Sequence, residues 1–271
     1  MSLTIHPDLV QGSDEWLAAR RGIVTASVVG QLISTRKLAA SEYPCPACGT
    51  GVTDPCVSKR DGKEIRTMHP ERTDLARADN ATIIEPANND TSRGLTFLLA
   101  SERITGWTEP TFMNDAMMRG VEDEPRARAK YSEHTAPVME CGFMVEDRWG
   151  FQLGYSPDGV VGDDGLIEVK SRSPKIQVMT VVADEVPTEN MAQLQCGLLV
   201  SGRSWCDYIS YAGGMNLWRK RVYPDEKWFA AILAAANAFE QNAADIISSY
   251  RESVADLPMT ERTIENFGLV I

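Results

Sequence analysis

Two carboxylates and a lysine surround one predicted turn near the middle of the chain. Asp158 precedes a short apolar strand, and Glu168 and Lys170 lie on the next strand. The Gly-Asp-Asp-Gly sequence at 162–165 is typical of a hairpin turn. Side chains two apart on a strand point to the same face, so Glu168 and Lys170 share a face and Val169 points to the other. The hairpin is expected to bring Asp158 alongside them.

This combination suits metal-assisted hydrolysis of a phosphodiester. Carboxylate oxygens are the ligands that Mg²⁺ (or Mn²⁺) prefers, with water and substrate phosphate completing its shell. A bound metal lowers the pKa of a water and neutralises charge that develops on the phosphate, and a nearby ammonium can orient that water. Taken alone, Glu-x-Lys also fits an exposed ion pair on an edge strand, so the short pattern does not decide between the two interpretations.

A second constellation combines three cysteines and a histidine, Cys45-x2-Cys48-x7-Cys56-x12-His69. This spacing predicts a closed tetrahedral Cys3His site for structural Zn²⁺, without catalysis because no ligand position stays open. Its segment, residues 41–72, is rich in Cys, Pro, Gly and charge, and indicates an inserted module that needs a metal to become ordered. An iron–sulfur cluster, a redox Cys-x-x-Cys pair and unpaired thiols are the alternatives.

Composition narrows the class of protein. The hydrophobic fraction of 43% predicts a globular chain, and the net charge of -11 argues against a protein that coats DNA non-specifically. A nuclease with a small, focused basic site is compatible with that charge. The start of the chain has no signal-peptide pattern, and no apolar run approaches a membrane span. We expect a cytoplasmic protein, in the host cytoplasm if phage-encoded, without a membrane partner.

The element pattern predicts an α/β fold with a mixed central sheet flanked by helices. Ser13 is expected to cap the first helix, and Pro125 is expected to interrupt the stretch 115–132 by starting or kinking a helix there. The predicted helices are 14–20, 26–33, about 92–106, 115–132, 174–184, 188–200 and 225–250. The predicted strands are 138–146, 149–156, 159–161, 166–170, 206–212 and 217–223, and residues 76–89 are expected to be a polar linker.

Five short motifs occur in a recognisable order: 16–27 (WLAARRGIVTAS), 119–124 (RGVEDE), 156–159 (SPDG), 168–170 (EVK) and 191–195 (MAQLQ). Together they resemble the lambda-exonuclease, or YqaJ-like viral recombinase, family of the PD-(D/E)XK nuclease superfamily. The resemblance implies a restriction-endonuclease-like core, with residues 1–271 as one exonuclease domain that carries the zinc-binding insertion.

The resemblance also implies roles for individual residues. Asp158, Glu168 and the Val169 carbonyl would bind catalytic Mg²⁺, and Lys170 would position the attacking water. Three further roles follow: Glu124 at a second metal position, Gln193 as support for Lys170 or the water, and Arg20 with Ser27 as a phosphate contact.

Each assignment carried over from the family has a rival. Glu122 competes with Glu124, and Gln195 competes with Gln193. Arg20 could be an ordinary charge at a helix end, and Ser27 an ordinary hydroxyl at a helix start.

The function implied by the resemblance is a 5′-to-3′ exonuclease that degrades one strand from double-stranded DNA ends. The single-stranded tails would serve phage-type recombination, with a homotrimeric enzyme and a single-strand annealing protein as partner. The alternatives are an endonuclease or single-strand nuclease on the same core, and a non-enzymatic, zinc-stabilised DNA-binding protein.

Overall fold

The computed structural model describes residues 3–110 and 113–262, in which the strands form two four-stranded sheets and a separate ribbon. The first sheet has the order β1 (Thr4–His6), β5 (Phe143–Glu146), β6 (Leu153–Tyr155), β2 (Val24–Thr25). The second has the order β10 (Trp218–Val222), β9 (Trp205–Tyr211), β8 (Gly165–Ser171), β7 (Gly159–Val161). Each sheet contains one parallel pair among antiparallel ones, β2 with β6 and β8 with β9. The predicted α/β class with mixed sheets is confirmed, although the strands divide between two sheets.

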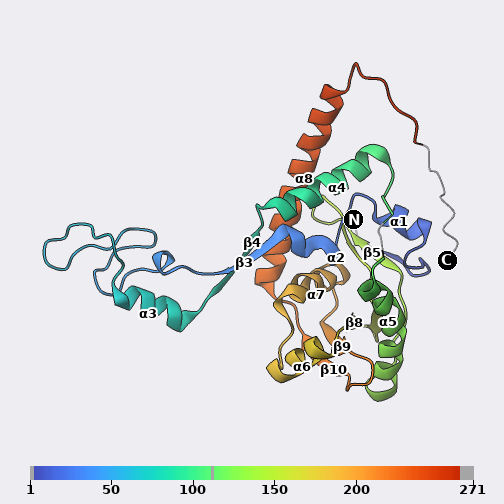
Figure 1. Cartoon of the computed structure of the whole chain (residues 1–271), viewed down its shortest axis with the longest axis horizontal. Coiled ribbons are helices and arrows are strands. Elements are labelled where there is room, and N and C mark those ends of the chain that lie inside the picture. The colour runs from blue at the N-terminus through green and yellow to red at the C-terminus, as the bar shows by residue number, and fades with distance from the viewer. Residues whose placement is uncertain (1–2, 111–112, 263–271) are drawn as a thin grey trace.

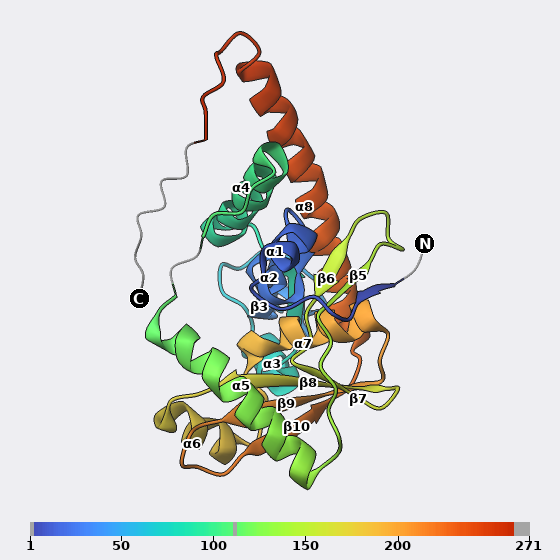
Figure 2. The same ribbon diagram turned by 90° about the vertical axis from the view of Figure 1, so that its right-hand side faces the viewer.

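One apolar helix packs against both sheets. Helix α7 (Thr188–Ser201) contacts β5 and β6 of the first sheet and β9 of the second, and it lies between the two sheets in Figure 2. Leu194 and Leu198 are buried in the main core. Gly197 lies so close to the Tyr155 ring that a Cβ there would be 2.7 Å from a ring carbon. The close fit fixes α7 relative to β6.

A second helix covers the other face of β8. In α5 (Asp115–His134), Ala127 and Tyr131 pack with Ile167, Val169 and Ile209 of the second sheet. The expectation that Pro125 interrupts this helix is wrong, because α5 continues through it. Proline costs one backbone hydrogen bond, and the apolar contacts made after Pro125 hold the helix together beyond it.

The predicted polar linker at 76–89 is also wrong. Helix α3 (Pro70–Asp79) occupies its first part, and β4 (Thr82–Pro86) pairs in antiparallel register with β3 (Ile33–Lys37). In Figure 1 this ribbon leads away from the body of the molecule and ends in the segment that contains the cysteine cluster and α3. The cysteine-rich segment therefore stands apart from the sheets.

The remaining helices mostly match the predicted ranges. Ser13 accepts a hydrogen bond from the Trp16 amide and caps α1 (Asp14–Arg20), as expected. Further helices are α2 (Ala26–Val29), α4 (Asp90–Thr105), α6 (Pro174–Ala183) and α8 (Glu226–Ser253), with 3-10 turns at Gly30–Leu32 and Ala40–Glu42. Among the helices of the described residues, none has the length and apolarity to cross a membrane.

Candidate active site and cysteine cluster

The β7–β8 hairpin brings together the side chains that its sequence predicted. Gly159 pairs with Ile167, which places Asp158 beside Glu168 at the end of β7. The Lys170 Nζ lies 2.7 Å from the Glu168 Oε1, so these two side chains do share a face. The Asp158 Oδ2 accepts a hydrogen bond of 2.6 Å from the Val169 amide. The amide and carbonyl of one strand residue point to the same edge, so the Val169 carbonyl also faces Asp158.

Helix α7 adds a glutamine to this group. The Gln193 Nε2 donates to the Glu168 Oε1 at 2.5 Å, and the Gln193 Oε1 accepts from the Lys170 Nζ at 2.9 Å. Gln195 turns elsewhere and bonds the Tyr223 carbonyl and the Asp225 amide. The structure therefore places Gln193, and not Gln195, beside the carboxylates.

Glu124 reaches the same area from α5. Burial raises its pKa, and the charge of Glu168 raises it further although Arg128 opposes this. The Glu124 carboxylate bonds the Arg128 guanidinium at 2.8 Å. Glu122 instead is largely exposed, 3.8 Å from Arg126. Of the two glutamates, Glu124 is the one oriented toward the hairpin.

The electrostatics of the group favour a cation. Burial raises the pKa of Asp158 well above its usual range, and the negative charges of Glu168 and Glu124 add to the rise. Burial opposes the charge of Lys170, but the carboxylates of Glu168 and Asp158 outweigh it and raise the lysine pKa. Carboxylates that repel one another in a buried site are stabilised in their charged form by a divalent ion.

The donor set fits a hard cation. Asp158, Glu168, Glu124 and the Val169 carbonyl offer oxygen atoms only, as Mg²⁺ and Mn²⁺ prefer. These carboxylates are not gathered tightly: in the described part of the chain, the Cys/His cluster is the only group of three or more Cys, His, Asp or Glu residues whose ligand atoms all lie within 4.8 Å of one another. Glu124 is held by the Arg128 guanidinium and Glu168 by the Lys170 ammonium.

A group of side chains around Arg20 lies next to the hairpin. The Arg20 Nη2 donates to the Thr25 and Ser27 hydroxyls, at 3.0 Å each, and its guanidinium stacks 4.0 Å from the centre of the Trp16 ring. The Trp16 Nε1 bonds the Ser156 Oγ at 2.9 Å, two residues before Asp158. Arg20 and Ser27 are thus brought together, and Trp16 connects them to the turn that carries Asp158.

Three participants were missed from the sequence. The Tyr155 hydroxyl lies 3.4 Å from the Glu168 Oε2. On α5, the buried Asp123 accepts a 2.7 Å hydrogen bond from Ser171, the residue after Lys170. Ser156 and Asp123 lie within recognised motifs, which could have indicated them, whereas nothing local distinguishes Tyr155.

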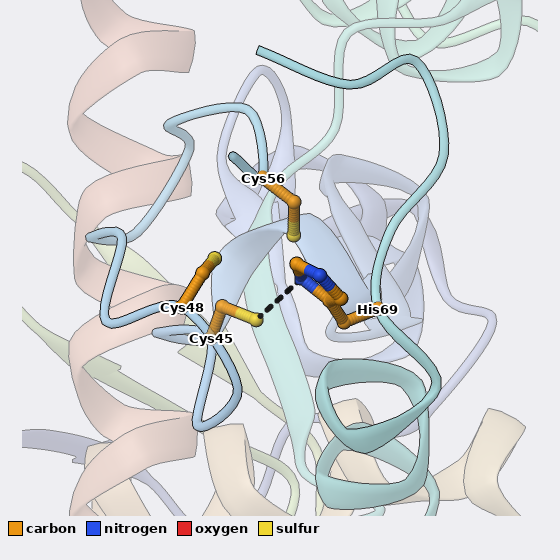
Figure 3. Close-up of side chains that lie close together, drawn as sticks. All are labelled: Cys45, Cys48, Cys56 and His69. Carbon is orange, nitrogen blue, oxygen red and sulfur yellow. Dashed lines mark hydrogen bonds between the residues drawn. The ribbon is translucent and has the colours of Figure 1, made fainter. Parts of the chain in front are cut away.

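The four predicted metal ligands converge in the protruding segment. Figure 3 shows the three sulfurs around the imidazole of His69, and the Cys45 Sγ lies 3.5 Å from the His69 Nδ1. Hydrogen bonds, first of all from Thr50, lower the pKa of Cys48 to about 5. The backbone of His69 is the main cause that lowers the pKa of Cys56 to about 7. Low thiol pKa values favour the thiolate that binds a metal.

Arg72 organises the backbone around this cluster and was not predicted. It is almost fully buried and donates to five backbone carbonyl oxygens and, at 3.5 Å, to the Cys56 sulfur. The five carbonyls belong to Ala40, Ser41, Tyr43, Gly51 and Asp54. No carboxylate of residues 3–110 or 113–262 pairs with this buried guanidinium, which is satisfied by carbonyl dipoles and a thiol. Arg72 therefore ties α3 to the loops that carry the cysteines.

Comparisons with known proteins agree with this arrangement. Residues 76–204 match the family model "YqaJ-like viral recombinase domain", and residues 10–87 match "Putative DNA-binding phage zinc finger domain". A search among curated proteins gives no significant match. The chain is similar to the crystal structure of an alkaline exonuclease (LHK-Exo) from Laribacter hongkongensis, at 26% identity and a TM-score of 0.65, over 91% of this chain and 100% of the other.

The structure of LHK-Exo in complex with dAMP gives the same identity, coverage and TM-score. The second match, over residues 10–87, spans the cysteine cluster and the ribbon that carries it. The first family match, the likeness to LHK-Exo and the hairpin geometry all agree in supporting a relation to the lambda-exonuclease, YqaJ-like viral recombinase family, whose model matches residues 76–204 of this chain.

Proposed function

We propose that this phage-type DNA exonuclease degrades one strand of double-stranded DNA from a 5′ end, with Mg²⁺ or Mn²⁺, and leaves single-stranded tails for recombination. The observation that carries the proposal is the convergence of Asp158, Glu168, Lys170 and Gln193 from a hairpin and a facing helix. The likeness to LHK-Exo, an alkaline exonuclease, supports hydrolysis from an end. The 5′-to-3′ direction rests on the family resemblance.

The residues of the hairpin would bind metal and position water. Asp158, Glu168 and the Val169 carbonyl would hold one divalent ion, and Glu124 would contribute to a second position. The ion supplies a water of lowered pKa and neutralises charge on the phosphate. Lys170 would hold the attacking water, since its ammonium is fixed between Glu168 and Gln193. Gln193 would orient Lys170 by accepting a hydrogen bond from its ammonium.

Arg20 and Ser27 would bind a phosphate of the strand being cut. A guanidinium recognises phosphate with two parallel hydrogen bonds, and Trp16 keeps the Arg20 plane in place from one side. The resulting site is suited to a 5′-terminal phosphate or to the phosphate next to the cut.

Cys45, Cys48, Cys56 and His69 would hold one structural Zn²⁺ in the protruding segment. The thiolates and the imidazole form the closed donor set that zinc prefers, so no ligand position is left for substrate. Residues 41–72 would then be an inserted module within a single nuclease domain, and α3 would anchor it through Arg72. DNA ends are the proposed partner, and a homotrimer with an annealing protein follows from the resemblance alone.

A panel of DNA substrates tests this function. With Mg²⁺, the chain is expected to digest linear duplex, to prefer 5′-phosphorylated ends, and to leave covalently closed circles and single strands largely intact. Labels on each strand end show the direction of digestion. Rapid cutting of closed circles would support an endonuclease, and a preference for single-stranded DNA would support a single-strand nuclease. Binding without any cutting, under Mg²⁺ or Mn²⁺, would support a non-enzymatic DNA-binding protein.

A further inference from the structure

Arg172 continues the line of functional side chains on β8. Glu168 and Lys170 share one face of the strand, and the alternation of side chains puts the next position on that face at Arg172. The backbone keeps this register past the end of the strand, because the Arg172 amide donates to the Tyr211 carbonyl at 2.7 Å. The Arg172 side chain therefore lies one step beyond Lys170, along the same surface.

Two neutral side chains hold the Arg172 guanidinium in place. Its Nη2 donates to the Asn190 Oδ1 at 2.5 Å and to the Tyr208 hydroxyl at 2.7 Å. Asn190 lies one helical turn before Gln193 on α7, so one face of α7 positions both Lys170 and Arg172. Tyr208 lies opposite Glu168 in the parallel pair of strands. The guanidinium is thus fixed before any ligand arrives.

Arg172 has a charge that the protein leaves uncompensated. Among the described residues no carboxylate forms an ion pair with it, and its Nε is buried without a hydrogen-bond partner. Arg221 on the same sheet shows the contrasting arrangement, because the Asp207 carboxylate neutralises it at 2.8 Å. Arg20 resembles Arg172, since hydroxyl groups hold it too. A half-buried cation that is oriented but unpaired is stabilised by an external anion.

We propose that Arg172 binds a backbone phosphate of the DNA, the one next to the phosphate that is cut. Asn190 and Tyr208 are its positioning residues. This inference rests on the proposed function, because the anion is the DNA substrate. Lys170 and Arg172 then lie one after the other along the DNA strand. Lys170 takes part in the reaction, and Arg172 holds the strand in position. Arg20, held from α1, would bind a different phosphate.

The test compares the affinity of Arg172→Gln and of the matched surface variant Arg93→Gln for a short linear duplex. Binding is measured in Ca²⁺, which we expect to support binding with little cutting. Arg93 pairs with the exposed Asp90 on α4, so its substitution changes net charge equally at a distance from β8. Arg172→Gln is expected to weaken binding about tenfold, as for one charge-assisted hydrogen bond. The slope of log affinity against log salt should also fall by about one phosphate contact. Arg93→Gln should change neither quantity.

Tyr208→Phe provides a second, milder variant. It removes one positioning hydroxyl and keeps the charge, so it should weaken binding by less than Arg172→Gln and leave the salt slope unchanged. In the double variant the effect of Tyr208→Phe should vanish, because the residue that it positions is gone. Unchanged affinity and salt slope in folded Arg172→Gln would overturn the proposal. If Arg172→Gln does not fold, full affinity of Tyr208→Phe would overturn it.

Failure of the proposed exonuclease function can be distinguished from failure of the Arg172 proposal. A wild-type chain that binds duplex but does not cut it in Mg²⁺ contradicts the exonuclease, whereas the binding comparison for Arg172 still gives its answer. A wild-type chain that binds no duplex contradicts both.

Discussion

At the scale of single residues, Lys170 is held as tightly as its proposed role requires. Its ammonium contacts the Glu168 carboxylate and the Gln193 amide oxygen, and the Gln193 amide nitrogen returns to the same carboxylate. This triangle leaves the lysine with one further donor for a water or a phosphate. The geometry therefore assigns Gln193 a positioning role, which acts through Lys170 and Glu168.

Separate substitution of Gln193 and Gln195 on α7 distinguishes the positioning role of Gln193 from a purely structural role. Gln193→Ala is expected to lower kcat on linear duplex by about tenfold or more, as for the loss of a residue that orients a metal site. Gln195→Ala is the matched control: it should keep kcat but destabilise the fold by roughly 1–2 kcal/mol, because it leaves the Asp225 amide without its acceptor. The measurements are steady-state cutting and chemical unfolding. Equal kcat for wild type and Gln193→Ala would remove Gln193 from the mechanism.

The sequence predicted those site residues whose neighbours lie close to them along the chain, and it left open those whose position depends on contacts with distant elements. Asp158, Glu168 and Lys170 follow from a turn and a two-residue alternation, both of which are local. The choice of Gln193 over Gln195, and of Glu124 over Glu122, depends on which side of a helix faces the sheet. Both helices have polar residues on several sides, so only packing decides, and the family resemblance supplied the choice that the spacing left open.

At the scale of elements, Asp207 on β9 connects the second sheet to α5. Its fully buried carboxylate accepts hydrogen bonds from Tyr131 of α5 and from Arg219 and Arg221 of β10. Because α5 also carries Glu124, this cluster helps to set the position of that glutamate. Burial alone would raise the pKa of Asp207, but the hydrogen bonds from Arg221, Tyr131 and Arg219 outweigh it, and the pKa is lowered.

The stability of Asp207→Asn should depend on pH in a defined direction. A carboxyl group whose pKa is lower in the folded state stabilises the fold above its unfolded pKa of about 3.9, and this contribution disappears as the pH falls through the folded pKa. At neutral pH, Asp207→Asn is expected to lose roughly 3 kcal/mol of unfolding free energy, as for a broken buried ion pair. The difference from wild type should shrink in acid.

Urea unfolding of both proteins across this pH range measures the effect. Asp184→Asn is the matched control, because Asp184 is exposed and pairs with Lys220 of the same sheet. Its cost should stay below about 1 kcal/mol at every pH. A difference between wild type and Asp207→Asn that grows in acid would contradict the account of this cluster.

The elements that the sequence did not predict lack a one-sided apolar pattern. Within the described residues, strands β3 and β4 pair with each other, and Ile33 and Ile84 pack from them against the main core. Such isolated apolar positions do not form an alternating pattern, and β4 was mistaken for a linker. Pro125 was expected to interrupt the helical stretch, but α5 continues through it and is held by apolar contacts with the distant Ile167 and Val169. Both errors arise where contacts from elsewhere in the chain outweigh local preference.

At the scale of the whole molecule, the cysteine cluster and the nuclease hairpin belong to different parts of the structure. The β3–β4 ribbon carries the cluster away from the sheets (Figure 1), and Arg72 organises its interior independently of the main core. The proposed zinc would therefore stabilise the protruding segment, while the hairpin keeps its own support from α5 and α7.

Loss of one cysteine ligand should affect that segment first. Cys48→Ser is expected to lose the bound zinc and to become protease-sensitive within residues 41–72, because metal binding supplies folding energy there. Cutting of short duplexes should persist. The matched control is Cys141→Ser, a half-buried cysteine outside the cluster, which should keep its zinc. Elemental analysis and limited proteolysis measure both; a wild-type chain with well under one zinc would contradict the assignment.

The most direct test of the nuclease site is the single-turnover cutting rate of Glu168→Gln on linear, 5′-phosphorylated duplex with Mg²⁺. Glu133→Gln is the matched control, since Glu133 is exposed and pairs with Lys130. We expect Glu168→Gln to fold, to bind duplex and to cut at least about a hundredfold more slowly, because the transition state loses an electrostatic contact. Glu133→Gln should cut at the wild-type rate. A folded Glu168→Gln that cuts as fast as wild type would contradict the central claim that the β8 carboxylate is part of the catalytic site.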